Sequence, residues 1–208
     1  MTASIGQPLT TPRSFLDRKA IVCVALDLLD DVGIHGLSTR RLATALGIKS
    51  ATLYWHFKRK DDILDEMSRA MFEECGRLEN VSERDFDLLA RMAENAREIR
   101  RVALSRRDGA LIMGRIRTDG RVGSLDPDDV RGAMSCGLSE KEGALAVEIL
   151  RRFAIGAATQ EQSSHRNARA GSSSNADESF EFGLNTLIRG LRARIAERQP
   201  HAVRGMIA

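Results

Sequence analysis

Apolar residues recur along most of this chain at intervals of three and four positions, the spacing of amphipathic helices. The first set follows Asp17, a residue type that accepts hydrogen bonds at helix N-termini, and Gly33 marks its expected end. Further helices are predicted over 38–46, 50–57 and 61–76, with Ser38 and Ser50 as the expected N-caps of the first two.

The middle of the chain carries further helix signals. Ser82 and Asp85 have capping-box spacing, with Asp in place of the usual Glu or Gln, before a long periodic segment that ends near 105. Residues 109–117 are a short apolar piece between helix-breaking residues. A further helix is expected at 126–137, where Asp precedes Pro as an N-cap precedes the first helical residue.

Two long helices are predicted in the last third of the chain. Ser139 and Glu142 form a second capping box before one of them, and Asp177 begins the other. Residues 163–176 between them are polar and rich in Gly and Ser, which predicts a mobile loop. No run of alternating β-branched residues is present, so we expect an all-α fold without strands.

Composition agrees with a folded helical protein, and charge adds a functional hint. The 208 residues are 42% hydrophobic, 29% charged and only 4% aromatic. The net charge of +3 is unevenly distributed, since residues 1–60 carry nine Lys or Arg against four Asp and the remainder carries a slight acidic excess. A basic front end is typical of nucleic-acid-binding proteins, although a solvated basic surface without a partner has the same layout.

Cysteine, histidine and terminal patterns narrow the setting. The three cysteines, Cys23, Cys75 and Cys136, form no CxxC pair, which favours a reducing compartment in which each thiol is a small apolar side chain. No apolar stretch reaches the roughly 20 residues that span a bilayer, and residues 1–14 lack the apolar core of a signal peptide. We therefore expect a cytoplasmic protein, and the scattered histidines predict no metal or other cofactor.

The segment 38–60, STRRLATALGIKSATLYWHFKRK, has the layout of a helix-turn-helix. Gly47 permits the bend between its two helices, and apolar positions such as Leu46 and Leu53 can pack them together. The second helix would then present small or hydrogen-bonding side chains to a DNA major groove. Many helix pairs with a glycine turn bind nothing, so the spacing alone leaves a purely structural role open.

Each predicted DNA contact has its own chemical reason. The Arg40 guanidinium can bind guanine or a phosphate, and Lys49, Lys58 and Lys60 suit phosphate contacts, which position the protein without specifying sequence. The full predicted set is Thr39, Arg40, Lys49, Ser50, Ala51, Thr52, Tyr54, His56 and Lys60.

At this point the sequence resembles the tetracycline-repressor (TetR) family of regulators. The likeness lies in ALDLLDDVGIHGLSTRRLATALGIKSATLYWHFKRKDDILDEM, of which ATLYWHFKRKDDIL is the most specific part. It implies that the residues 54–57 end the recognition helix and that Lys60 clamps a phosphate. The segments ALSRRDGA, RFAIGAATQEQ and FEFGLNTLIRGL resemble the C-terminal domain of the tetracycline repressors, which implies a homodimer with a four-helix interface and an inducer pocket.

The drug site of that subgroup is only partly present in this chain. The resemblance places drug-contacting positions at Asn95 and Arg117, but the two histidines that serve the drug and its metal fall at Gly76 and Met113. Neither residue can replace an imidazole, and the acidic outer position falls at Gln160. We therefore expect tetracycline–Mg²⁺ not to be the ligand.

A more apolar effector is the better expectation, because Ile99, Met113 and Phe153 would line a cavity with few polar anchors. Each of these side chains could equally be plain core, and Arg117 could be a surface charge. The predicted ligand-binding set is Asn95, Ile99, Met113, Arg117, Phe153 and Gln160.

The resulting hypothesis is a ligand-responsive regulator that binds a palindromic DNA operator as a homodimer and is released by a small molecule, with the helix over 61–76 as the lever. A non-specific architectural DNA protein is disfavoured by the low net charge, and an enzyme by the lack of a Gly-rich phosphate loop, a GxSxG motif or a metal cluster. The sequence does not choose between repression and activation. The expected divisions are an N-terminal arm (1–16), a helix-turn-helix domain (17–62), a ligand-binding and dimerisation domain (63–199) and a tail (200–208).

Overall fold

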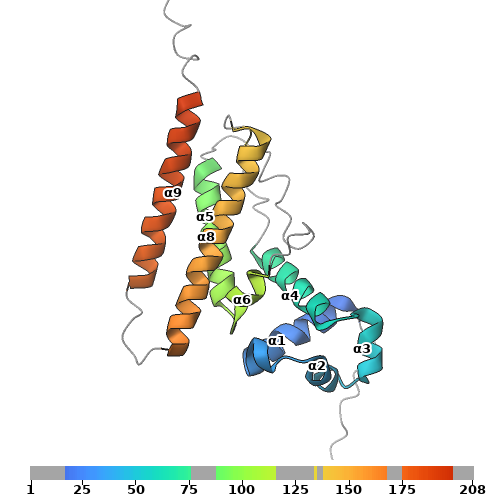
Figure 1. Ribbon diagram of the computed structural model, residues 1–208. Coiled ribbons are helices and arrows are strands. Elements are labelled where there is room, and N and C mark those ends of the chain that lie inside the picture. The colour runs from blue at the N-terminus through green and yellow to red at the C-terminus, as the bar shows by residue number, and fades with distance from the viewer. Residues whose placement is uncertain (1–16, 76–87, 116–133, 135–137, 168–174, 199–208) are drawn as a thin grey trace, which may run out of the picture.

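The computed structural model describes residues 17–75, 88–115, 134, 138–167 and 175–198, and every regular element within them is a helix. The all-α prediction is therefore confirmed for this part of the chain. Helices α1 (Arg18–Gly36), α2 (Thr39–Ala45), α3 (Ser50–His56) and α4 (Lys60–Glu74) lie at one end, and α5 (Leu88–Leu104), α6 (Gly109–Met113), α8 (Glu140–Asn167) and α9 (Ala176–Arg198) form the rest (Figure 1).

Local capping explains where the first helices begin. The Asp17 carboxylate accepts a hydrogen bond from the Ala20 N–H at 2.7 Å, and the Ser38 hydroxyl accepts one from the Arg41 N–H at 3.2 Å, as predicted. The prediction for α3 is wrong by one residue, because Ser50 is its first helical residue and Lys49 is the N-cap. Lys49 makes no side-chain capping bond, so the start of α3 lacks the support that α1 and α2 have.

Gly33 bends α1 instead of ending it. Its φ of +70° lies in the left-handed region that glycine adopts without strain, and the chain then makes another turn up to Gly36. A side chain at Gly33 would also come within 2.8 Å of an Asp108 carboxylate oxygen. The bend therefore brings the end of α1 close to the turn between α5 and α6.

The second half agrees with the predicted capping box but not with the full predicted loop. The Ser139 N–H donates to the Glu142 carboxylate at 3.1 Å ahead of α8, as the spacing predicts. Helix α8 then continues to Asn167 and α9 begins at Ala176, so the predicted loop over 163–176 is wrong for residues 163–167 and for Ala176. An established helix adds such polar residues at a cost below about 1 kcal/mol each. The predicted helix starts at 82–85 and 126–127 lie outside the described residues.

Three long helices make up the body. Helices α5, α8 and α9 pack against one another side by side, and α6 lies among α4, α5 and α8 (Figure 1). Helix α4 packs on α1 as well as on α5 and α6, and therefore joins the N-terminal helices to the body. Buried apolar side chains run through both parts as one cluster. None of the described helices is both long and apolar enough to cross a membrane.

Candidate DNA-binding face and its joint with the helical body

The helix-turn-helix is held together by its own small core. Leu42 of α2, Leu53 of α3 and Phe57 after α3 are almost completely buried. At the turn, the Ile48 N–H donates to the Ala43 carbonyl at 3.0 Å, and Gly47 has a φ of +64° with no atom near its missing side chain. This packing fixes α3 against α2 and turns the opposite side of α3 to solvent.

The predicted base-reading side chains lie on that outer side. Ser50, Ala51, Thr52 and Tyr54 are exposed, and His56 is half-buried. From the neighbouring elements, Arg40 and Lys49 are also exposed and Thr39 is half-buried. An exposed row of hydroxyl, small and basic side chains on a short helix has the chemistry that base edges and phosphates require.

Trp55 is a candidate site residue that the predicted set omits. Its side chain is 82% exposed, far more than expected for the single tryptophan of a chain with so few aromatics. The Lys58 ammonium lies 5.9 Å from the centre of its ring. An aromatic face beside a lysine suits contact with a sugar–phosphate backbone, and the interleaving of aromatic and basic residues over 54–58 was the available signal.

Several basic side chains on this face have no carboxylate partner among the described residues, although the adjacent Arg59 pairs with Asp62 at 3.3 Å. Arg40, Lys49 and Lys58 make no ion pair within the described chain, so their charge is available to an external anion. Lys60 differs, because its half-buried ammonium donates to the Ile34 carbonyl at 3.2 Å. Two of its three N–H donors remain for the predicted phosphate contact.

The turn between α5 and α6 is fastened to the end of α1. The Asp30 carboxylate accepts from the Arg107 N–H at 2.8 Å and from the Arg106 guanidinium at 3.1 Å. The Asp108 carboxylate accepts from the Ile34 N–H at 2.9 Å, with Asp108 itself in the left-handed conformation. The peptide groups on either side of Ile34 are thus bound from the body, through Asp108, and from α4, through Lys60.

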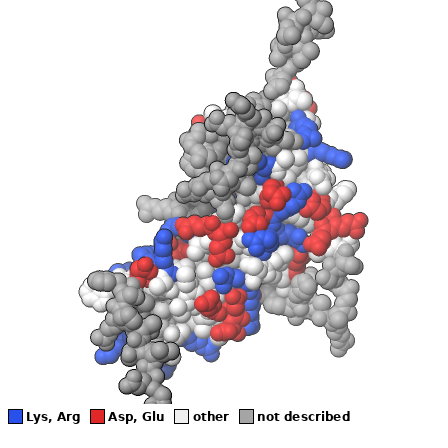
Figure 2. All heavy atoms as spheres, turned by 180° about the vertical axis from the view of Figure 1, so that it is seen from behind, with Lys and Arg blue, Asp and Glu red and all other residues white. Residues whose placement is uncertain are grey.

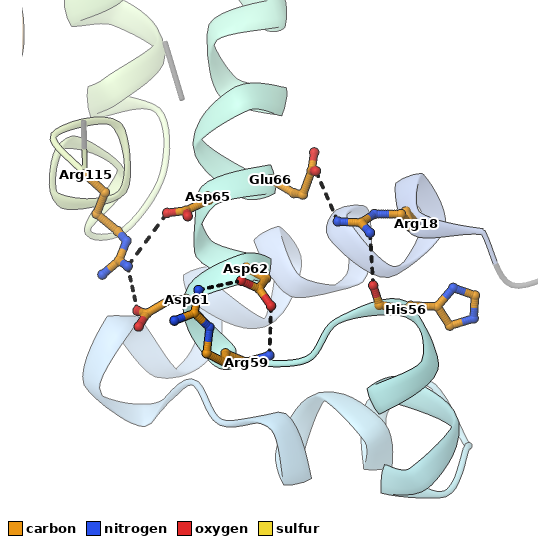
Figure 3. Close-up of polar contacts among 8 residues, drawn as sticks. All are labelled: Arg18, His56, Arg59, Asp61, Asp62, Asp65, Glu66 and Arg115. Atoms are coloured by element: carbon orange, nitrogen blue, oxygen red, sulfur yellow. Dashed lines mark hydrogen bonds and ion pairs between the residues drawn. The ribbon is translucent and has the colours of Figure 1, made fainter. Parts of the chain in front are cut away.

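A second fastening joins the end of α6 to the start of α4. The Arg115 guanidinium donates to the Asp61 carboxylate at 2.6 Å and lies 3.8 Å from that of Asp65 (Figure 3). Since Asp61 and Asp65 are one helical turn apart, one arginine holds the first turns of α4. This contact is a physical connection between α6 and α4.

Gln162 of α8 supports the turn from the other side. Its amide nitrogen donates to the carbonyls of Ala103 at 3.0 Å and Arg106 at 2.8 Å, and its amide oxygen accepts from the Ala110 N–H at 3.2 Å. Gln160, which the family resemblance places in the ligand-binding set, is exposed. Only the placement of α8 against the turn reveals the role of Gln162.

The predicted ligand-binding residues occupy different environments. Ile99 and Met113 are buried, Asn95 is half-buried, and Arg117 lies outside the described residues. The Phe153 ring stacks on Phe180 of α9 with centroids 5.3 Å apart. The described residues therefore do not bring the whole predicted set into one site.

The body interior holds one charge that the sequence pattern did not indicate. Arg151 of α8 is almost fully buried, and its guanidinium lies 4.6 Å from the ring centre of Phe72 in α4. Burial lowers the pKa of Arg151, because the apolar surroundings disfavour its charged form. No group of three or more His, Cys, Asp or Glu side chains suited to a metal occurs among the described residues.

Known proteins share both parts of this arrangement. Residues 21–67 match the family model for bacterial regulatory proteins of the tetR family. Residues 82–172 match the model for the tetracyclin repressor-like C-terminal domain. The class A tetracycline repressor protein from transposon 1721 of Escherichia coli is 31% identical over 199 residues, which cover 86% of this chain and 92% of that protein.

Solved structures show the same architecture. A variant of TetR from Acinetobacter baumannii AYE, in complex with minocycline, superposes with a TM-score of 0.74 at 31% identity, covering 86% of this chain and 97% of the other. BioQ with its double-stranded DNA operator superposes with a TM-score of 0.67 at 27% identity, covering 86% and 99%. With the exposed α3 and the fastened α4, these matches lead to one conclusion: the chain belongs to the tetR family and is a ligand-responsive, DNA-binding transcriptional regulator.

Proposed function

We propose that this protein is a homodimeric repressor that binds a palindromic operator in the cytoplasm and leaves it when a small molecule enters the helical body. The observation that carries the proposal is the outer face of α2 and α3, where Arg40, Lys49 and Tyr54 are exposed and the two cations make no ion pair with any described residue. Two copies of such a face, related by a twofold axis, would read two half-sites of a palindrome. BioQ, a structural neighbour, has been solved with its double-stranded DNA operator.

Exposed apolar side chains on α8 and α9 supply a surface for the second copy. Leu145 and Ile149 are exposed one turn apart on α8, and Phe182 on α9 is 75% exposed. Large apolar side chains on adjacent helices are costly in water and are buried by association. We place the dimer contact on α8 and α9. This leaves the reading head of each protomer, by which we mean helices α1, α2 and α3, at the far end of the molecule (Figure 1).

Release from DNA would use the two sets of contacts that connect the N-terminal helices to the body: those of the α5–α6 turn with α1, and that of Arg115 with α4. A ligand can shift the head only if its affinity differs between the DNA-bound and released arrangements. Binding beside α6 would move Arg115, and with it Asp61 and Asp65 of α4. The reading heads would then no longer match the spacing of the two half-sites.

The effector is proposed to be largely apolar. Gly76 and Met113 replace the imidazoles that the family's drug and metal require, while Ile99 and Met113 are buried apolar groups. Asn95 and Arg117 remain the proposed polar anchors. A structural neighbour has been solved in complex with minocycline, which supports a small-molecule ligand for this fold.

The proposal is tested by selecting DNA from a random-sequence library with the purified full-length protein. We expect an enriched inverted repeat that binds the dimer at least ~1,000-fold more tightly than scrambled DNA at physiological salt. Equal affinity for both duplexes would instead indicate a non-specific architectural protein. A reporter gene placed behind the selected repeat then separates repression from activation, since repression requires a lower signal when the protein is present.

A further inference from the structure

Arg18, the first residue of α1, reaches across the head to the end of the recognition helix. Its Nη1 donates to the carbonyl oxygen of His56, the last residue of α3, at 3.0 Å (Figure 3). Its guanidinium lies 4.4 Å from the ring centre of the buried Phe57. Its Nη2 binds the Glu66 carboxylate of α4 at 3.2 Å. One side chain therefore connects three helices at the point where α3 ends.

The recognition helix depends on support of this kind. Helix α3 has only seven residues and no side-chain cap at its start, and helices this short are marginal by themselves. The last carbonyls of any helix lack intrahelical donors, and a cation is favourable at that end. Arg18 supplies both a donor and a positive charge there, at the residue that follows the exposed Trp55.

The contacts of Arg18 are poorly suited to stabilising the whole fold. The Arg18 and Glu66 side chains are 53% and 25% exposed, and exposed ion pairs contribute little to folding. Hydrogen bonds between side chains and base edges, in contrast, tolerate displacements of only about half an ångström. The same contacts therefore matter far more for where α3 lies than for whether the protein folds.

We propose that Arg18 is a positioning residue that fixes the recognition helix against α4 and so sets operator specificity. The inference rests on the proposed function. Glu66 gives it a physical connection to the body, because α4 also carries Asp61, which Arg115 holds from α6 (Figure 3). Arg18 thus makes the end of α3 follow α4, and a shift of α4 alters the reading side chains as well as the spacing of the heads.

The rival role for Arg18 is a direct phosphate contact. Losing a phosphate contact weakens binding to every DNA sequence and lowers the salt slope of binding by about one unit. Losing a positioning contact lowers the ratio of specific to non-specific affinity and leaves the salt slope unchanged. The two roles are therefore separated by one set of titrations.

The first experiment compares Arg18→Ala with Lys19→Ala, which removes the same charge from the next, exposed residue. Fluorescence anisotropy would follow binding to the inverted repeat selected by the wild type and to a scrambled duplex, at several salt concentrations. For Arg18→Ala we expect an affinity ratio reduced about tenfold, with non-specific affinity within about twofold of wild type. An unchanged ratio, or an equal loss on both duplexes with a lower salt slope, overturns the proposal.

Glu66→Gln tests the same connection without altering Arg18. The change makes the protein more positive, so simple electrostatics predicts tighter binding to all DNA, whereas positioning predicts a weaker affinity for the selected repeat alone. Glu73→Gln, an exposed change on the same helix, is the control for charge. Glu66 also binds Arg69, so Arg69→Ala is included to separate that contact. Tighter or unchanged binding by Glu66→Gln, on both duplexes, contradicts the connection.

Trp55 gives a readout that does not use DNA. As the single tryptophan, next to His56, it should change its emission in free Arg18→Ala but not in free Lys19→Ala, at an unchanged melting temperature. Identical emission spectra of both variants and the wild type would remove Arg18 from the support of α3. If the wild type selects no repeat, the proposed function fails, whereas a failure of Arg18 alone leaves wild-type specificity intact.

Discussion

The reading head and the body treat their charged side chains differently. In the head, Arg40, Lys49 and Lys58 face solvent without an ion pair in the described chain. In the body, the Arg97 guanidinium donates to both oxygens of Glu181 at 2.7 and 2.8 Å and joins α5 to α9. Figure 2 shows basic and acidic side chains interleaved over the body. The paired charges of the body therefore connect its helices, whereas the unpaired cations of the head are available to bind an external anion.

The body is also more extensively packed than the head. Helices α5, α8 and α9 each contact both others, and the half-buried Arg100 and Glu161 join two of them with a paired hydrogen bond at 2.7 and 2.8 Å. Helix α2 packs mainly on α1 and α3, and α3 packs mainly on α2. We therefore expect the head to lose its structure more readily than the body, as is typical of a region that must move.

The largest effect that would sharpen this comparison is Leu53→Ala. Leu53 is almost fully buried between α2 and α3, so we expect the head to lose about 2–5 kcal/mol and to melt before the body. Circular dichroism should show a partial early transition, and operator binding should disappear while the dimer persists in sedimentation. The matched change Leu184→Ala, buried in α9, should instead lower the main transition. A single shared transition for Leu53→Ala would show that the two regions unfold as one.

The next effect concerns the exposed reading side chains. Arg40→Ala and Tyr54→Ala should each weaken binding to the selected operator by about 1–3 kcal/mol if the side chain touches a base. Their melting temperatures should stay at the wild-type value, because neither side chain is part of the core. Arg152→Ala removes an equally exposed arginine that pairs with Glu148 in the body, and should leave DNA binding unaltered. A comparable loss for Arg152→Ala would erase the distinction between the two sets of charges.

Lys60→Ala tests a residue that connects the two regions, because Lys60 begins α4 and donates to the Ile34 carbonyl of α1. We expect weaker binding to operator and scrambled DNA alike, with a salt slope lower by about one unit, if the ammonium also reaches a phosphate. Loss of its hydrogen bond to the Ile34 carbonyl should cost about 1 kcal/mol of stability. A stability loss with an unchanged salt slope would make Lys60 purely a structural residue.

The smallest predicted effect is the acid sensitivity of the body. Hydrogen bonds from Arg97 hold the pKa of Glu181 below its ordinary value of 4.5. The stabilisation is therefore complete above that ordinary value and is lost as the pH falls through the lowered, folded-state pKa. Because the two side chains are 38% and 41% exposed, we expect less than about 1 kcal/mol.

Urea unfolding of wild type and Glu181→Gln between about pH 7 and pH 3 measures this difference directly. The gap in the free energy of unfolding should be constant near neutral pH and should close in acid. A gap that is unchanged in acid would mean that the Arg97–Glu181 contact contributes through packing and not through charge.

Local signals in the sequence predicted the head well. The Ser38 cap and the turn at Gly47 act within a few residues of themselves, so spacing alone sets α2 and its bend. The Ser139–Glu142 box predicted the start of α8 for the same reason. At Ser50, a residue that often caps a helix became its first member, since Ser is also tolerated inside and Lys49 already has the extended backbone of a cap.

The joint between head and body could not be predicted in this way. Arg18 meets His56 from 38 positions away, Arg115 meets Asp61 across 54, and Gln162 meets Ala103 across 59. No periodicity encodes such pairings, because they depend on how complete helices pack. The candidate ligand residues show the same limit: burial of Ile99 and Met113 agrees with hydrophobicity, while the stacking of Phe153 on Phe180 follows from the position of α9.

The backbone N–H and carbonyl of Ile34 determine which experiment can detect the contact between the head and the body. Both of its bonds, to Asp108 and to Lys60, use backbone atoms, so replacing Ile34 by Val or Leu leaves them intact. A scan of side-chain substitutions would therefore score this position as permissive. Amide hydrogen exchange would register it instead, since the Ile34 proton is shielded only while Asp108 stays docked, and its exchange rate would follow the opening of the joint in solution.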